Sequence, residues 1–455
     1  MFKSKMSAIF CLLLFAVAFM FSGCNSQPLA DANAKPKYVF LFIGDGMGPT
    51  TRQYYAHEYP DSSLETFPVT VHTGTNNVHN TTTDSAASGT AIACGIKTYN
   101  KAIGVDAQKK PVVSLAKKLR DKKYSIGIIT SVGLNDATPA AHYANRNTRG
   151  EYAGILEDLY ASNFNFFAGG WIARPSKFTM NDFAAQLKKH NYHYRSEFTF
   201  DASTPTDRIV FIGSMLPDWP AAEQSRHILS EVTAYAANCL VKNPNGFFMM
   251  VEGGAIDHRN HNNDLAGAMR EMREFDLAVK TALEFQKKYP EETLIIITSD
   301  HDTGGMNILG YKDAAMWTKQ IKMAINADAE VAKRVAKQSD QNIIDYLTGY
   351  FGMDKLSESE YKAMTEAIRI YRDPKLRKKR EFRSMYGSYN PVVVQMMRLR
   401  DARAGVNWSS FSHTPRKILT NASGVGQELF KEVKENSDIP HAISRAMLGE
   451  DVLAE

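Results

Sequence analysis

The stretch Lys37-Tyr-Val-Phe-Leu-Phe-Ile43 decides the fold, together with the Gly44-Asp45-Gly46-Met47-Gly48 that follows it. A continuous apolar run of this length is typical of a strand buried on both faces. Similar runs recur and alternate with longer segments of helical periodicity. This alternation predicts an α/β fold with a mostly parallel central sheet and helices on both faces. The other predicted strands are 124–131, 208–212, 246–251 and 293–298, and the predicted helices are 112–121, 151–162, 221–241 and 264–287.

Four of these strands end in segments rich in Asp, Glu, His and Thr. In a parallel sheet, ligands bind beyond the carboxyl ends of the strands, so these side chains are expected to meet at one edge. Any one of the His residues alone is equally well explained by a polar loop or a helix cap, but four such strand ends in one chain are not. Carboxylates mixed with imidazoles suit Zn²⁺, whereas oxygen donors alone suit Mg²⁺. The segments are 44–48, 135–139, 252–261 and 299–305.

A small-residue helix is predicted to begin near Asp84-Ser85-Ala-Ala-Ser88. Asp84 can be a plain N-cap residue, but that interpretation leaves Ser85 without a task. As a nucleophile, Ser85 needs an adjacent base or a metal to activate its hydroxyl. No Gly-x-Ser-x-Gly motif surrounds it. A metal-activated alkoxide therefore fits the carboxylate and imidazole edge better.

Together these motifs resemble the alkaline phosphatase family, in the family's order and from about residue 37 to 440. Each motif is weak to moderate alone, and the set is highly specific. The matching segments are Ile43-Gly-Asp45-Gly-Met-Gly48, Thr83-Asp84-Ser85-Ala-Ala-Ser88, Asp136-Ala-Thr138-Pro139, Glu252-Gly-Gly-Ala-Ile-Asp257-x-x-x-His261, Thr298-Ser-Asp300-His301 and Ser412-His413-Thr414.

The resemblance implies a site with two Zn²⁺ ions and one Mg²⁺ ion. It implies Asp257, His261 and His413 as ligands of the first zinc, and Asp45, Asp300 and His301 as ligands of the second. It implies Asp45, Thr138 and Glu252 around the magnesium, with Asp136 supporting that ion through bound water. His258 stands where relatives differ, which leaves Mg²⁺, Zn²⁺ and Co²⁺ open for the third site.

The resemblance also implies the reaction and its catalytic residues. Phosphate monoesters would be hydrolysed through a phosphoserine on Ser85, with Arg149 gripping the phosphoryl group and Asp84 orienting that Arg. Arg146 is the alternative clamp if the spacing contains a small gap.

Three other functions compete with a phosphomonoesterase. A sulfatase needs Pro and Arg after its nucleophile, and both are missing after Ser85. Diesterase relatives generally lack the third-metal residues, whereas Thr138 and Glu252 are present. A lipid-anchored zinc- or phosphate-binding protein would use the ligands but would have no need for Ser85.

The amino terminus has the features of an export signal. Lys3 and Lys5 precede a short apolar run that ends at Ser22-Gly23-Cys24. This pattern predicts a lipoprotein-type signal peptide over 1–23, a lipid anchor on Cys24 and a tether over 24–36. An ordinary secretory signal is the alternative. The expected location is therefore periplasmic or outer-membrane.

Composition limits the partners. Of 455 residues, 44% are hydrophobic and the net charge is +5. So small a surplus on a chain this large argues against nucleic-acid binding. Small phosphate monoesters are the expected partners, and a homodimer is an expected state because many relatives are dimers. Cys94 and Cys239 read as buried helical thiols, too few for a cysteine metal site.

Within the predicted catalytic domain, 37–455, an insertion of roughly 306–408 precedes His413. The family places variable, cap-like insertions here. Its segment 372–403 carries ten Lys and Arg residues against three acids. This basic segment is interpreted either as a solvated charged surface or as a cap that steers phosphate esters to the site.

Overall fold

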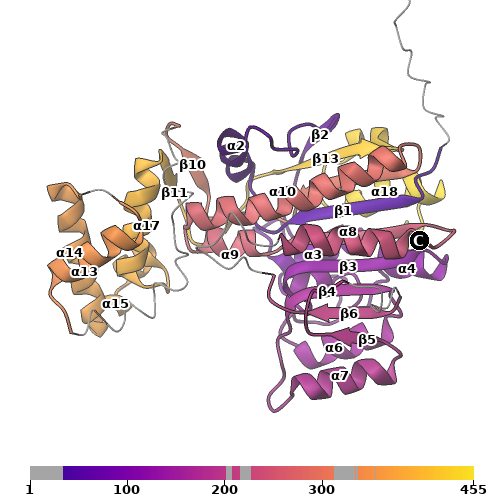
Figure 1. The fold of residues 1–455 in the computed structure, drawn as a ribbon, viewed down its shortest axis with the longest axis horizontal. Helices are drawn as coiled ribbons and strands as arrows, with labels where there is room; N and C mark the ends of the chain where they lie inside the picture. Colours follow the sequence, from indigo (N-terminus) through magenta and orange to yellow (C-terminus); the bar gives the residue numbers. More distant parts are fainter. Residues whose placement is uncertain are drawn as a thin grey trace, which may run out of the picture. The chain divides into compact units, whose positions relative to one another are not determined.

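A nine-stranded sheet forms the centre of the computed structural model, which describes residues 34–200, 207–215, 227–311, 331, 334, 337–353 and 355–454. The chain divides into two units, Met1–Ala34 and Lys35–Glu455, and the whole sheet belongs to the second. The strand order is β2-β13-β8-β1-β7-β3-β4-β6-β5 (Figure 1). The strands are β1 Tyr38–Gly44, β2 Val69–Thr73, β3 Ser125–Gly133, β4 Phe166–Trp171, β5 His193–Arg195, β6 Ile209–Ile212, β7 Phe247–Gly253, β8 Thr293–Ser299 and β13 Ile418–Gly424.

The seven strands from β8 to β5 run parallel to one another, and β13 is antiparallel to both of its neighbours, β8 and β2. The predicted mostly parallel sheet is thus confirmed. All five predicted strands are present, with ends shifted by one or two residues.

Helices cover both faces of the sheet because the side chains of β1 alternate between two apolar clusters. Tyr38, Phe40 and Phe42 pack with α8 and α10, whereas the intervening Val, Leu and Ile pack with α3, α4, α6 and α18. The helices of the sheet domain are α2 Pro49–Glu58, α3 Ser85–Cys94, α4 Leu115–Asp121, α5 Ala137–Ala140, α6 Tyr152–Ala161, α7 Met180–Lys189, α8 Ile228–Leu240, α9 Ala255–His261, α10 Leu265–Lys288, the 3-10 helix η1 Gln427–Glu432 and α18 Asp438–Leu448.

The predicted helices are present with two changes at their starts. The helix predicted over 112–121 begins at Leu115, because the Ser114 side chain accepts a hydrogen bond from the Lys117 backbone and caps it. The helix predicted over 221–241 is α8, and residues 221–226 lie outside the described residues. Asp84 is the N-cap of α3, where its carboxylate accepts from the backbone N–H of Ala87.

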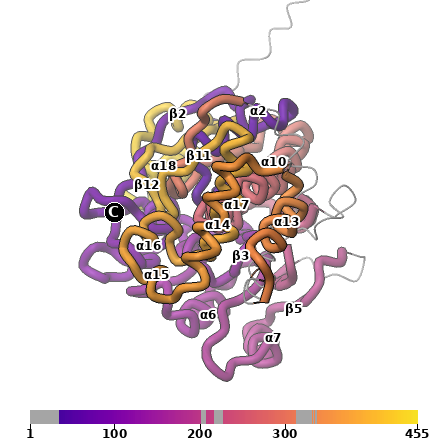
Figure 2. The backbone as a smooth tube through the Cα atoms, turned by 90° about the vertical axis from the view of Figure 1, so that its left-hand side faces the viewer, coloured from indigo at the N-terminus to yellow at the C-terminus, as the bar shows by residue number. Residues whose placement is uncertain are grey.

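Five described helices, α13 to α17, lie between strands β10 (Met306–Ile308) and β11 (Val406–Trp408), which pair with each other. We call them the cap helices, and Figure 2 shows α14 to α17 side by side. Residues 312–330 of the predicted insertion lie outside the described residues. The cap helices are α13 Asp340–Tyr350, α14 Glu358–Arg372, α15 Pro374–Lys378, α16 Arg380–Tyr386 and α17 Pro391–Arg403.

Buried polar contacts join the cap helices to the sheet domain. Arg400 Nη2 on α17 lies 3.1 Å from Asp264 Oδ1 at the start of α10, and Tyr54 on α2 donates to the Ala404 carbonyl. Asp401 accepts from Trp408 Nε1 on β11 at 2.8 Å. These groups are shielded from water, so the contacts fix the carboxyl end of α17 against the domain.

The predicted signal peptide, the Cys24 anchor and nearly all of the predicted tether lie outside the described residues. Among the described helices, none combines the length and the apolar character needed to cross a membrane. Cys94 on α3 and Cys239 on α8 are buried free thiols, as predicted.

Candidate active site

The carboxyl ends of β8, β1, β7 and β3 lie next to one another and bring the predicted site residues to one rim. Ile43 on β1 is in register with Glu252 on β7, and Gly44 with Ser299 on β8. Asp45 and Asp300 therefore leave adjacent strands at the same height. The backbone N–H of Gly46 donates to Asp300 Oδ1 at 3.0 Å, which fixes that carboxylate beside the turn after β1.

A first group of donor atoms consists of Asp45, Asp300 and His301, all buried and within 4.8 Å of one another. His301 Nε2 lies 3.2 Å from Asp300 Oδ2 and 3.7 Å from Asp45 Oδ1. Burial, and next the charges of His413 and His261, hold the pKa of His301 well below its ordinary value. The lowered pKa favours the neutral imidazole, which is the form that ligates a metal ion.

A second group combines Asp257 with His413 and His301, again within 4.8 Å. His261, predicted with Asp257 and His413, lies at its edge, with Nε2 3.4 Å from Asp257 Oδ2 and 3.1 Å from His413 Nε2. His261 Nδ1 donates to the Phe411 carbonyl at 2.5 Å and His413 Nδ1 to the Thr83 carbonyl at 3.0 Å. With Nδ1 thus occupied, both rings present Nε2 to the centre, as a metal ligand requires.

The third predicted metal position involves Asp45, Glu252 and Thr138. Glu252 at the end of β7 is buried, and burial is the largest cause that raises its pKa, with the charges of Asp136 and Asp300 adding to it. Thr138 on α5 is also buried. Asp136 is the N-cap of α5 and accepts from the Ala137 N–H.

Three carboxylate oxygens of this rim are buried and have no hydrogen-bond partner among the described residues. They are Asp45 Oδ1, Glu252 Oε2 and Asp300 Oδ2. Burial raises the pKa of Asp45, with Asp300 and Asp257 adding to it, and burial also raises the pKa of Asp300 to about 7. Unpartnered buried carboxylates that repel one another are costly unless a cation neutralises them. The donor set therefore fits divalent metal ions.

Ser85 is the first residue of α3 and is buried at the centre of this arrangement. Its Oγ lies 3.2 Å from His301 Nε2. The neighbouring Asp84 accepts from two backbone N–H groups, Ala87 within the helix and Lys101 in the next loop. These bonds fix the start of the helix and hence the position of the Ser85 hydroxyl.

Arg149 lies beside Asp84, the residue before this serine, and Arg146 does not. Arg149 Nη2 donates to Asp136 Oδ1 at 2.7 Å, and Nη1 lies 3.6 Å from Asp84 Oδ2. Burial opposes its charge, but Asp136, Asp84 and Asp45 outweigh burial and raise the pKa of Arg149. Arg146 is instead held by Asp158 at 3.0 Å and by the Gly154 carbonyl.

Two residues add to what the sequence suggested. His258 is exposed and its ring stacks on Trp171, with centroids 6.3 Å apart. Thr303, to which the sequence analysis gave no role, donates to Asp257 Oδ1 at 2.6 Å and lies 3.2 Å from His301 Nδ1. Its place directly after Asp300-His301-Asp302 was the available signal. The backbone carbonyls of Thr83 and Phe411, which accept from His413 and His261, leave no such signal in the sequence, because every residue has a backbone carbonyl.

The chain belongs to the alkaline phosphatase family: residues 36–161 and 211–448 match the model of that family, described as "Alkaline phosphatase". It is thus an enzyme of a metal-dependent phosphatase family.

Individual relatives agree. Alkaline phosphatase 4 of Bacillus subtilis (strain 168) is 28% identical over 457 residues, which cover 94% of each chain. The solved cold-active alkaline phosphatase from a Shewanella species has a TM-score of 0.73 and 25% identity, covering 90% of this chain and 99% of that one. A histidine-to-aspartate mutant of the TAB5 alkaline phosphatase, solved with Mg bound in its M3 site, has a TM-score of 0.67 and 26% identity, covering 91% and 98%.

Proposed function

We propose that this chain hydrolyses phosphate monoesters through a phosphoserine on Ser85, at a site that holds two Zn²⁺ ions and one Mg²⁺ ion. The observation that carries the proposal is that the buried Ser85 hydroxyl lies 3.2 Å from His301 Nε2, while the adjacent Asp84 lies 3.6 Å from the guanidinium of Arg149. Neither a sulfatase nor a simple metal-binding protein explains why this serine has both a metal-donor cluster and the guanidinium of Arg149 nearby.

The donor atoms divide between the ions by their chemistry. Asp257, His261 and His413 would hold one zinc, and Asp45, Asp300 and His301 the other, since nitrogen and carboxylate donors suit Zn²⁺. Asp45, Thr138 and Glu252 offer oxygen atoms alone, which suits Mg²⁺. When bound, the ions neutralise phosphoryl charge and lower the pKa of coordinated hydroxyl groups.

The reaction is a double displacement at phosphorus. The Ser85 oxygen forms a bond to phosphorus while the bond to the leaving alkoxide breaks, and water then cleaves the phosphoserine to give inorganic phosphate. Arg149 donates two parallel N–H groups to the phosphoryl oxygens and holds the phosphate in line. Asp84 and Asp136 hold that guanidinium in place. The free N–H groups at the start of α3 also favour the dianion.

Replacing the nucleophile tests this function. Ser85→Ala removes the attacking hydroxyl but keeps every Asp, Glu, His and Thr side chain proposed to hold the metals, so zinc content should stay near that of the wild type. Turnover of p-nitrophenyl phosphate should fall by at least about a thousandfold. Ser88→Ala is the matched control, because the Ser88 hydroxyl points to the Asp300 carbonyl rather than to the donor cluster. Full turnover by Ser85→Ala would remove Ser85 from the mechanism.

We also propose that the chain is an exported lipoprotein anchored through Cys24, as the pattern before that residue suggests. Labelled palmitate should enter the wild-type chain in a bacterial host and be absent from Cys24→Ser.

A further inference from the structure

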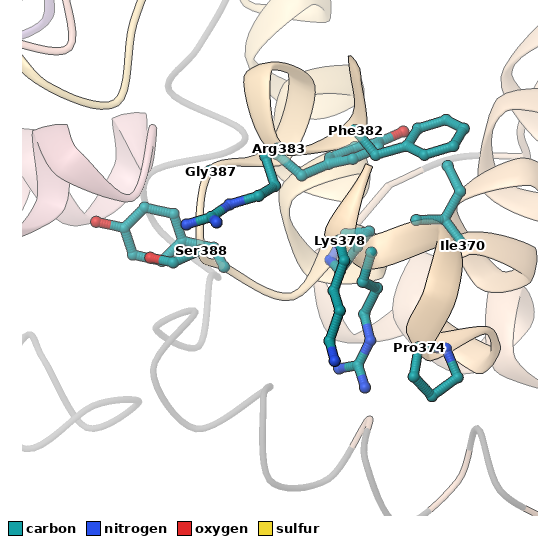
Figure 3. Close-up of a pocket in the computed structure, with 11 residues that line it drawn as sticks. Ile370, Pro374, Lys378, Phe382, Arg383, Gly387 and Ser388 are labelled. Carbon is teal, nitrogen blue, oxygen red and sulfur yellow. The ribbon is translucent and has the colours of Figure 1, made fainter. Parts of the chain in front are cut away.

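A cavity of about 290 Å³ lies within the cap helices, at α15, α16 and the loop that follows them. Figure 3 shows its apolar wall, formed by Ile370, Pro374 and Phe382, and the basic side chains that surround it. Those basic residues are Arg377, Lys378 and Arg383. The volume is at the lower end of the range for small-ligand sites, so it suits one compact anionic group and a short apolar segment.

The charges around this cavity differ from those of other arginines in the cap helices. Arg369 pairs with Glu366, Arg372 with Asp340, and Arg403 with Glu360. In contrast, no carboxylate lies within ion-pair distance of Arg377, Lys378 or Arg383 in the part of the chain that the structure describes; Arg377 lies over the ring of Tyr371. Three exposed cations that have no counter-charge among the described residues line one cavity, and this favours an anion.

The cavity adjoins the proposed metal ligands through Phe411. Gly387 and Tyr389 line the cavity, and the ring of Tyr389 lies 5.4 Å from that of Phe411. A Cβ added to Gly387 would come within 3.3 Å of the Phe411 ring, so the loop after α16 packs closely on it. The carbonyl of the same Phe411 accepts the hydrogen bond of His261. Burial, and next the charge of Asp257, raises the pKa of Tyr389, which agrees with this proximity.

We propose that this cavity binds a second phosphate group carried by the leaving group of the substrate. The inference rests on the proposed function, since it assumes that the ester is cleaved at Ser85. The preferred substrates would then be esters of a diol with phosphate at both ends. One phosphate lies at Ser85 and the other among Arg377, Lys378 and Arg383, with the connecting chain along the apolar wall.

A series of α,ω-alkanediol bisphosphates of three to eight carbons tests the inference on the full-length enzyme. Each bisphosphate is compared with the alkyl monophosphate of the same length. The kcat/KM of the bisphosphate is first halved, because it carries two ester groups that can be cleaved. At the chain length that spans the two sites, kcat/KM should favour the bisphosphate by about tenfold, mainly through KM. Equal values at every length would overturn the inference.

Variants of the cavity show where such a preference arises. In the double variant Lys378→Gln with Arg383→Gln, the ratio of the two kcat/KM values should fall to near one. Both side chains are exposed, so the variant should keep the thermal midpoint of the wild type. Arg380 lies on α16, as Arg383 does, but does not line the cavity. The control variant Arg380→Gln should therefore keep the wild-type ratio. A preference that survives the double variant would show that the cavity does not carry it.

Turnover of p-nitrophenyl phosphate separates this inference from the function on which it rests. A wild-type enzyme that does not cleave it would overturn both. A wild-type enzyme that cleaves it but shows no bisphosphate preference would overturn the cavity assignment alone.

Discussion

The metal rim at the ends of β1, β7 and β8 and the cap helices are both rich in charge, but they balance it in opposite ways. In the rim, Asp45, Glu252 and Asp300 are buried side by side, and each has a raised pKa because water is excluded. In the cap helices, Arg369 pairs with a carboxylate at the surface and Arg403 with one that is partly buried. Charge that the chain itself leaves unbalanced in its interior marks where cations bind, whereas paired surface charge contributes little beyond solubility.

The largest expected effect is loss of activity on removal of metal ions. A chelator should lower p-nitrophenyl phosphate turnover by at least about a thousandfold, because the phosphoryl charge is then opposed by the bare carboxylates. Zn²⁺ with Mg²⁺ should restore it, and metal analysis should give two zinc ions and one magnesium per chain. A phosphatase that resists exhaustive chelation would contradict the metal assignment.

The next effect should come from the clamp. Arg149→Lys keeps the charge but loses the two-pronged grip, so kcat/KM should fall by about 10- to 100-fold. Arg146→Lys is the matched control and should change kcat/KM by less than about threefold, because Arg146 is held by Asp158 away from Ser85. Equal losses in the two variants would leave the clamp unassigned.

A smaller effect concerns stability without metal. The folded pKa of Asp300, about 7, exceeds the ordinary 3.8, so protonation favours the folded state between these values and stability is lost as the pH rises through 7. At pH 8, Asp300→Asn should therefore raise the free energy of unfolding of the chelated protein by on the order of 2 kcal/mol. Denaturant melts at pH 8 and pH 5 measure this, and the gain should shrink at the lower pH. If Asp300→Asn lowered the free energy of unfolding at pH 8, the charged Asp300 carboxylate would not be unfavourable in the folded protein.

The smallest effect belongs to the cap helices. A hydrogen bond from Arg403 is the largest cause that lowers the pKa of Glu360 to about 2, so the pair stabilises the fold above pH 4.5 and loses that contribution as the pH falls toward 2. Glu360→Gln should cost less than about 1 kcal/mol at neutral pH. Urea melts at pH 7 and pH 3 should show the difference from wild type shrinking in acid. If Glu360→Gln lowered the free energy of unfolding by several kcal/mol, this pair would resemble the buried charges of the rim and not a weak surface ion pair.

The sequence predicts the central strands β1, β3, β7 and β8 and also β6, but it misses β4 and β5 as well as β2 and β13. Strands β1, β7 and β8 are continuous apolar runs because both faces are covered, and such runs are legible without a partner. The edge strand β2 and its neighbour β13 (Val69–Thr73 and Ile418–Gly424) mix apolar residues with Thr, His, Asn and Ser. Their place in the sheet depends on pairing across some 350 positions, which a local pattern does not encode.

The candidate site shows the same division. Motifs predict which residues meet, because the ends of parallel strands share one edge. They do not predict how a side chain is held, and the exposed position of His258 and the bond from Thr303 to Asp257 depend on neighbours from other elements. The choice between Arg149 and Arg146 likewise needed Asp84, Asp136 and Asp158 in space.

The late position of β12 (His413–Thr414) and β13 in the chain has a consequence for biogenesis. A polypeptide that emerges amino terminus first presents Asp45 and Ser85 more than three hundred residues before His413 and the strand that completes the sheet edge. Until then it has only part of the proposed metal ligands, and ions gained early would be held weakly. Catalytic competence therefore arrives at the end of synthesis, in whichever compartment receives the completed chain.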